Sequence, residues 1–166
     1  MGYFESGVSK AKIGDHKGAI ADYTRGIEQC SIFREYMAYY NRGVSRAELG
    51  DHKGAVSDFN KAIKLGPAIA WAYLSRGISK AELGDHNEAI ADYTKAIELN
   101  PKLAWAYLYR GIIKTLSGQK DCGLLDLKLA KAFGDERIDK AIRNFCNNPR
   151  IAKKLHITEL PERALY

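Results

Sequence analysis

Apolar residues recur at helical spacing in three stretches that stand 34 residues apart. Met37, Tyr40 and Val44 fall on one face of a helix because they follow one another by three and then four residues. The corresponding residues in the next two stretches are Trp71, Leu74 and Ile78, then Trp105, Leu108 and Ile112. A glycine-containing turn follows each stretch, at Gly50, Gly84 and Gly118. The pattern therefore predicts a series of helical units of equal length.

These stretches belong to an internal repeat. Between residues 36–69 and 70–103, 18 of 34 positions are identical, far more than composition would give by chance. Pro67 and Pro101 keep the same step. Self-similarity at a fixed period of this length is the sequence signature of a repeat architecture. We therefore interpret the chain as a repeat array.

The period and its fixed positions resemble the tetratricopeptide repeat, a helix-turn-helix unit of the same length. The residues that carry the resemblance in the best copy are Tyr73, Gly77, Gly84, Asp85, Ala89, Tyr93, Ala96 and Pro101. Two departures recur in the array, with Arg76 where the family signature has leucine and Lys80 where it has tyrosine. The resemblance covers residues 1–137 and implies an all-α, right-handed superhelical solenoid of helix-turn-helix hairpins with a C-terminal capping helix.

The units differ in regularity along the chain. We expect four repeats, a capping helix and a tail, at about 1–35, 36–69, 70–103, 104–137, 136–147 and 148–166. The first unit lacks the later proline, so its second helix is expected to run on or to end in an irregular turn that brings Phe33 and Tyr36 to the seam. The chain also opens inside a repeat, so a fragment of a longer array is one interpretation.

Small and aromatic residues explain how the two helices of one unit can touch. Gly43 permits a close approach, and Phe59 fills the space beside it. The Leu-Gly-Asp turn ends the first helix with a glycine that can take positive φ. The aspartate after that glycine is placed to cap the second helix, at Asp15, Asp51 and Asp85. After the last unit, Asp135 is expected to cap the final helix.

The first helix of each unit carries a second apolar face, beyond the one that packing within the unit requires. A helix with two apolar faces is buried on both or holds one for a partner. In the family the first helices line the concave face where peptides lie, so the resemblance implies an apolar and aromatic concave groove that binds a peptide or helix of a partner protein. The residues expected there, called the groove residues below, are Met37, Tyr40, Asn41, Val44, Trp71, Leu74, Ser75, Ile78, Trp105, Leu108, Tyr109 and Ile112.

Some members of the family hold a peptide's C-terminal carboxylate with lysine, asparagine and arginine from three successive first helices. Of these positions only Asn41 agrees here, so the sequence favours recognition of an apolar or aromatic segment. Two other interpretations of the apolar face remain open. It could be covered by the tail or by another copy of the chain, or it could pack between units.

Charged residues also recur once per unit. Arg42 and Asp58 are separated by 16 residues, and Arg76 with Asp92 and Arg110 with Asp126 repeat this spacing, which predicts ion pairs inside each hairpin. Lys10, Arg46, Lys80 and Lys114 form a basic ladder whose stems are expected to pack along the helix while the heads reach water. The recurring His16, His52 and His86 have no second ligand beside them, so we expect no metal site.

Composition adds limits on location. The formal net charge is +6, and residues 128–166 hold 9 basic against 5 acidic side chains. Cys30, Cys122 and Cys146 form no metal or redox motif, which indicates reduced thiols. The sequence shows neither a membrane-spanning run nor a signal peptide. A cytoplasmic location is therefore the default, although a removed targeting segment would leave the same sequence.

Motifs for nucleotide binding, serine hydrolysis and zinc-dependent hydrolysis are absent from the sequence. We therefore expect no catalysis, no cofactor and no small-molecule substrate, and we interpret the chain as a protein-interaction scaffold or adaptor. Self-association through the groove or the tail is one alternative. RNA or DNA binding is a further alternative, but nucleic-acid-reading repeats place polar side chains where this chain has apolar ones.

Overall fold

The computed structural model describes residues 2–29 and 35–147. Within these ranges the chain forms helices and no strands, which confirms the predicted all-α fold. The helices are α1 (Tyr3–Lys12), α2 (His16–Glu28), α3 (Glu35–Glu48), α4 (His52–Leu65), α5 (Ala70–Glu82), α6 (His86–Leu99), α7 (Ala104–Leu116), α8 (Lys120–Phe133) and α9 (Glu136–Asn147). Cys30, Phe33 and the tail at 148–166 lie outside the described residues.

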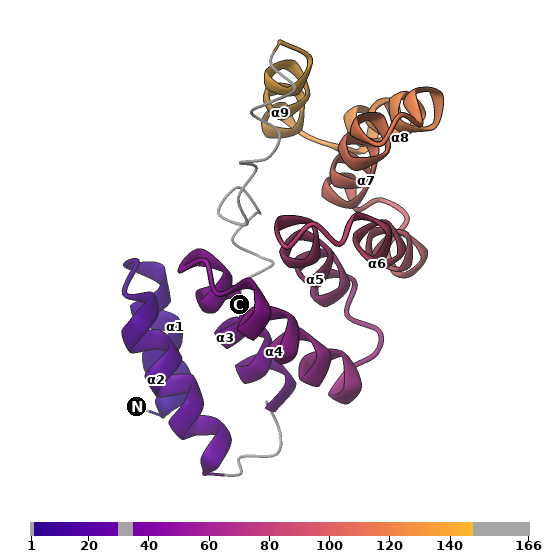
Figure 1. Ribbon diagram of the computed structural model, residues 1–166. Helices are drawn as coiled ribbons and strands as arrows, with labels where there is room; N and C mark the ends of the chain where they lie inside the picture. Colours follow the sequence, from indigo (N-terminus) through magenta and orange to yellow (C-terminus); the bar gives the residue numbers. More distant parts are fainter. Residues whose placement is uncertain (1, 30–34, 148–166) are drawn as a thin grey trace.

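Consecutive helices form hairpins that follow one another along the chain. Figure 1 shows the pairs α1–α2, α3–α4, α5–α6 and α7–α8 in sequence order, with α9 beyond the last pair. The second helix of each hairpin contacts the first helix of the next, and α9 contacts both α7 and α8. Buried apolar side chains form one continuous cluster from Tyr40 in α3 to Phe145 in α9. This arrangement is the predicted solenoid of helix-turn-helix hairpins.

Glycine permits the close contact within each hairpin. A Cβ atom built on Gly77 in α5 would lie 2.6 Å from Cε1 of Tyr93 in α6. At Gly43 the corresponding distance to Cε1 of Phe59 is 2.8 Å. Both aromatic rings are fully buried. The predicted fit of small against aromatic residues is therefore confirmed, because any larger side chain at these glycines would push the helices apart.

The turns between the helices show the predicted glycine geometry, but only part of the predicted capping. Positive φ occurs at Gly14, Gly50, Gly84 and Gly118, with values of 81°, 80°, 90° and 87°. Asp15 caps α2 by accepting a hydrogen bond from the Gly18 amide at 2.9 Å. Asp51 caps α4 in the same way, with the Gly54 amide at 2.9 Å.

The expectation that Asp85 caps α6 is wrong, because in the described turn its side chain accepts no capping hydrogen bond. The residue three positions later decides the difference. A Cβ atom on Gly54 would collide with the carboxylate of Asp51 in the side-chain conformation that caps α4. After Asp85 this position is Glu88, which has a Cβ atom and pairs with Lys80 instead.

The predicted ion pairs hold each hairpin together. Arg76 Nε and Nη2 donate to the two carboxylate oxygens of Asp92 at 2.8 and 2.6 Å. Arg42 with Asp58 and Arg110 with Asp126 repeat this bidentate geometry. The aspartates are buried, and a bidentate guanidinium satisfies two of their acceptor sites.

The basic ladder has a different role from the expected one. Lys80 Nζ lies 3.0 Å from Oδ2 of Asp92, and its side chain is 13% exposed, so its head does not simply reach water. Lys10, Arg46 and Lys114 pair in the same way with Asp22, Asp58 and Asp126. Each buried aspartate therefore lies close to a ladder cation of its own hairpin.

The ends of the described array differ from its middle. α2 ends at Glu28, so the first unit's second helix does not run on. Tyr36, at the start of α3, is 37% exposed. At the other end, the Asp135 carboxylate accepts a hydrogen bond from the Arg137 amide at 3.0 Å and caps α9 as predicted. α9 buries Ile138 and Phe145.

Candidate partner-binding groove

The groove residues lie on the first helices of three consecutive hairpins. Met37, Tyr40, Asn41 and Val44 belong to α3, Trp71, Leu74, Ser75 and Ile78 to α5, and Trp105, Leu108, Tyr109 and Ile112 to α7. α3 contacts α5, and α5 contacts α7, so the three sets are neighbours in space. The 34-residue period places them in register, because equivalent positions of successive hairpins face the same way.

Most groove residues are buried rather than exposed on the surface. Met37 and Trp71 are half-buried, and the other ten are buried. Leu74 and Leu108 have no exposed surface, so they support the groove from beneath. The two tryptophans differ, because Trp71 keeps exposed surface whereas Trp105 is 4% exposed.

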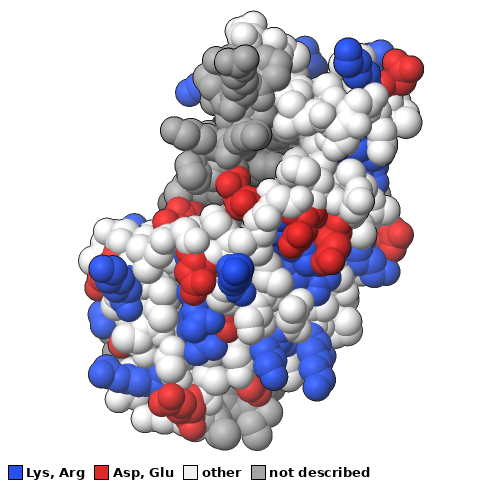
Figure 2. Space-filling view, viewed as in Figure 1, with Lys and Arg blue, Asp and Glu red and all other residues white. Residues whose placement is uncertain are grey.

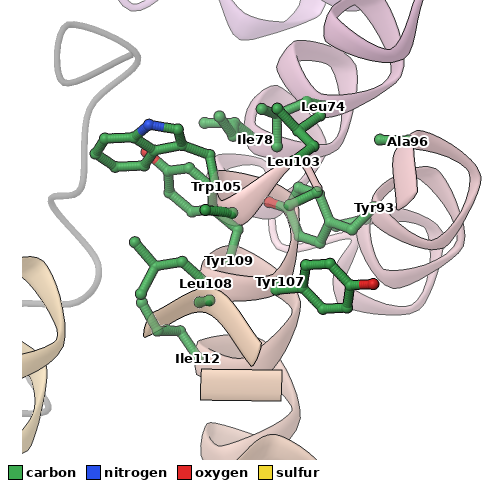
Figure 3. Packing of buried hydrophobic residues seen from close by; sticks show 14 of the residues in the cluster. Leu74, Ile78, Tyr93, Ala96, Leu103, Trp105, Tyr107, Leu108, Tyr109 and Ile112 are labelled. Carbon is green, nitrogen blue, oxygen red and sulfur yellow. The ribbon is translucent and has the colours of Figure 1, made fainter. Parts of the chain in front are cut away.

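Two sets of contacts order the buried groove residues. Trp105 stacks on Tyr109 with 6.0 Å between ring centroids, and Tyr109 stacks on Tyr93 of α6 at 5.9 Å. Figure 3 shows these three rings together with Ile112, which lies in α7 like Trp105 and Tyr109. The Tyr40 hydroxyl lies 3.4 Å from Oγ of Ser75, which links α3 to α5. Aromatic pairs at these centroid distances attract one another beyond the burial of their surface, so the three rings stabilise this part of the groove.

A pocket of about 520 Å³ lies between α5 and α7. Three groove residues, Ile78, Tyr109 and Ile112, line it. Its volume falls in the range of pockets that hold ligands, and such pockets are typically apolar with a few polar groups. The structure therefore brings these three residues to one hollow, whereas Met37 and Trp71 lie outside its lining.

The pocket also contains residues that the sequence interpretation missed. Glu82, Leu116 and Tyr93 are part of its lining. Glu82 follows Ile78 by four residues, and Leu116 follows Ile112 by four, so both extend the same helical faces by one turn. That spacing was the available signal. Tyr93 carries the family resemblance and packs on Gly77 within its hairpin, so its place in the pocket adds a second contact.

Asn41 presents a polar group that the described residues leave without a partner. The residue is 5% exposed, and its Nδ2 atom makes no hydrogen bond to any described residue. A buried amide donor without a partner costs free energy, so native proteins usually satisfy such groups.

Two tyrosines in and beside the groove stay neutral. Burial raises the pKa of Tyr40 to about 12, although the hydrogen bond to Ser75 acts in the opposite direction. Burial also raises the pKa of Tyr93 well above its ordinary value, and the nearby Tyr109 and Glu82 add to this effect. Both phenols therefore carry no charge at physiological pH.

We also searched the described residues for metal sites, membrane-spanning helices, charged patches and free thiols. Across residues 2–29 and 35–147, no three His, Cys, Asp or Glu side chains lie close enough to hold a metal ion. Nor does any helix in these ranges combine the length and apolarity needed to cross a membrane. Figure 2 shows acidic and basic side chains interspersed on the face in view. Cys122 and Cys146 are exposed free thiols.

Two family models match the chain, and both are described as tetratricopeptide repeat. They cover residues 36–69 and 70–103. A search of curated proteins finds no match.

Solved structures with the same architecture match most of the chain. MamA is 25% identical, with a TM-score of 0.74, and the match covers 79% of this chain and 75% of MamA. The first TPR domain of Spaghetti (RPAP3), bound to the HSP90 peptide SRMEEVD, is 28% identical, with a TM-score of 0.66 and coverage of 70% and 90%. YrrB, a TPR protein with an unusual peptide-binding site, has a TM-score of 0.74 and coverage of 86% and 73%; at 18% identity it shows the fold alone.

Proposed function

The chain belongs to the tetratricopeptide repeat family, and from this premise we propose that it is a noncatalytic scaffold that binds a segment of a partner protein in the groove formed by α3, α5 and α7. The segment enters as a helix or as an extended peptide, and both modes use apolar side chains as anchors. Repeats of this family and neighbours that bind peptides support the general role of an interaction module.

One observation carries the proposal for this chain. Ile78 and Ile112, chosen from the apolar pattern of the sequence, line the same pocket between α5 and α7, together with a third groove residue, Tyr109. A hollow with an apolar lining gives a partner side chain a place to bury its surface. Each large apolar side chain buried in this way contributes about 1.5–3 kcal/mol of transfer free energy.

The groove residues take different parts in this proposal. Trp71 keeps exposed surface and serves as the principal anchor contact, since large aromatic residues dominate binding hot spots. Trp105 and Tyr109 form a stacked aromatic pair on the α7 side of the groove. The fully buried leucines shape the groove without touching the partner.

The partner's chemistry is expected to differ from that of the peptide bound to RPAP3. That peptide, SRMEEVD, ends in acidic residues. In this chain the groove residues contain no lysine or arginine. A carboxylate would therefore find no cation among them, whereas an apolar or aromatic anchor would find matching surface.

Affinity capture with matched variants tests the proposal. Wild-type protein, the double variant Trp71→Ala/Trp105→Ala and the control Leu125→Ala are immobilised, and proteins retained from the source lysate are compared. Leu125 is an exposed apolar residue on α8, outside the groove. We expect the double variant alone to lose its retained proteins while keeping its helicity. Equal retention by all three proteins would contradict the proposal, and a double variant that unfolds is replaced by Trp71→Ala alone.

The two alternatives give other results. Self-association through the groove predicts that light scattering reports a mass above 18.5 kDa for the wild type and a smaller mass for the double tryptophan variant. Nucleic-acid binding predicts an affinity that falls steeply with salt concentration, because cationic side chains release counterions from the phosphates. Binding of a protein segment through apolar anchors predicts a weak dependence on salt.

A further inference from the structure

The lining of the pocket between α5 and α7 combines apolar residues with one acidic residue. Most of it is apolar, including Ile78, Ala81, Ile112, Ile113 and Leu116. Glu82, in the last turn of α5, is the one residue with a formal negative charge among the described residues of the lining, and none of the described lining residues is lysine or arginine. An apolar hollow is thus combined with one carboxylate.

The lysines of the two helices that flank the pocket, α5 and α7, are already paired elsewhere. Lys80 contacts both Asp92 and Glu88, each at 3.0 Å. Lys114, on the facing helix α7, contacts Asp126 at 3.0 Å. In the part of the chain that the structure describes, no ion pair involves Glu82. Its carboxylate therefore stands beside an apolar hollow without a counter-ion.

The field of this carboxylate reaches into the pocket. Glu82 is one of the charges that raise the pKa of Tyr93, after burial itself and Tyr109, which places its charge close to the buried ring. Tyr93 lines the same pocket. In the preceding unit Glu48 occupies the equivalent repeat position, whereas the first and fourth units have Lys12 and Leu116 there.

We propose, on the basis of the groove function above, that this pocket takes a large apolar side chain of the partner segment while Glu82 pairs with a lysine or arginine next to that side chain. The partner is thus a basic, apolar segment. Charge complementarity across an interface selects partners and suppresses those of the wrong sign. An acidic segment would place a like charge against Glu82 and would bind more weakly.

Selection from a library of random displayed peptides tests this proposal, with wild type, Glu82→Gln and Glu82→Lys as targets. Glu82 is exposed and lies at the C-terminal end of α5, where a lysine is tolerated by the helix dipole. We expect the wild type to enrich peptides that carry lysine or arginine beside a large apolar residue. Glu82→Gln should bind a selected peptide about fivefold more weakly, and Glu82→Lys should enrich acidic flanks instead.

A second variant tests the hollow separately from the charge. Ala81→Leu adds volume to the pocket wall from α5. It should reduce the enrichment of large apolar residues while keeping the preference for basic flanks. Helicity and melting temperature, measured for each variant, show whether the fold is intact. The same apolar enrichment with a filled pocket would overturn the assignment of the anchor to this hollow.

The outcomes separate this inference from the function on which it rests. If the wild type enriches no peptide, or if neither Trp71→Ala nor Ala81→Leu changes the peptides that are enriched, the groove function fails and the inference fails with it. If Trp71→Ala abolishes binding but the charge preference is unchanged in Glu82→Lys, the groove binds a partner segment and only the role of Glu82 is wrong.

Discussion

Arg76 in α5 donates a hydrogen bond from Nη1 to Oδ1 of Asn60 in α4, the second helix of the preceding hairpin, over 2.7 Å. The same guanidinium binds Asp92 of its own hairpin and lies over the ring of Tyr73, 5.4 Å from its centroid. Arg42 and Arg110 repeat this link, to Thr24 and Thr94. One recurring arginine therefore joins the two helices of a hairpin and ties that hairpin to the one before it.

This link makes Arg76 a sensitive position for stability. Arg76→Ala removes a partner of the buried Asp92 and leaves its charge partly uncompensated. We expect a loss of about 3 kcal/mol in the free energy of unfolding, at the low end for buried pairs because Lys80 remains beside Asp92. Urea unfolding followed by circular dichroism measures the loss.

The exposed pair Arg137–Asp135 supplies the control for Arg76, because both of its side chains are more than half exposed. Arg137→Ala should change the free energy of unfolding by less than about 1 kcal/mol. Asn60→Ala, which removes only the link to the preceding hairpin, should cost about 1 kcal/mol. An Arg76→Ala variant no less stable than Arg137→Ala would show that the arginine is not a structural link.

Asp51 and Asp85 occupy equivalent turn positions, but their replacement should have different effects on the free energy of unfolding. Asp51→Ala removes the cap of α4 and should lower the free energy of unfolding by about 1 kcal/mol. Asp85→Ala removes no cap and should change it by less than about 0.5 kcal/mol. Thermal and urea unfolding of both variants measure the difference, and equal losses would contradict the structural account of the two turns.

Acid should weaken the first hairpin through Asp22. Its hydrogen bonds with Lys10 and Ser6 hold the pKa of this carboxyl below its ordinary value of 3.8. Because the folded pKa is lowered, the stabilisation is present above the unfolded pKa and is lost as the pH falls through the folded one. Stability should therefore drop as the pH falls below about 4.

The matched variant for this pH effect is Asp22→Asn, which keeps the shape of the side chain and removes its titration. It should be less stable than the wild type near neutral pH and should lose less stability on acidification. Unfolding in urea at several pH values measures both quantities. An equal loss in the two proteins between neutral and acidic pH would refute a role for Asp22.

The repeat period made much of the fold predictable. Once Gly77 and Tyr93 recur with the same spacing in each copy, helix contact follows from size alone, and the pairing of Arg76 with Asp92 follows from their fixed separation. The missing cap at Asp85 was not predictable in the same way. It depends on whether a Cβ atom three residues later blocks the carboxylate, and the repeat period does not determine that contact.

In the groove too, some features were predictable from the sequence and others were not. The sequence placed the groove residues on neighbouring first helices, because their spacing alone determines which helix face they share. It did not predict that Trp105 is nearly buried while Trp71 keeps exposed surface, since this depends on the stacking of Trp105 on Tyr109. Nor did it predict that Lys80 binds Asp92, because the reach of a long side chain depends on the rotation of each helix.

Hydrogen–deuterium exchange of the protein, free and bound to a partner captured by the wild type, tests the central claim most directly. Occupation of the groove predicts slower exchange in α3, α5 and α7 on binding, with exchange in α4 and α8 unchanged. Slower exchange confined to α4, α6 and α8 would show that the partner binds the opposite surface and would contradict the account.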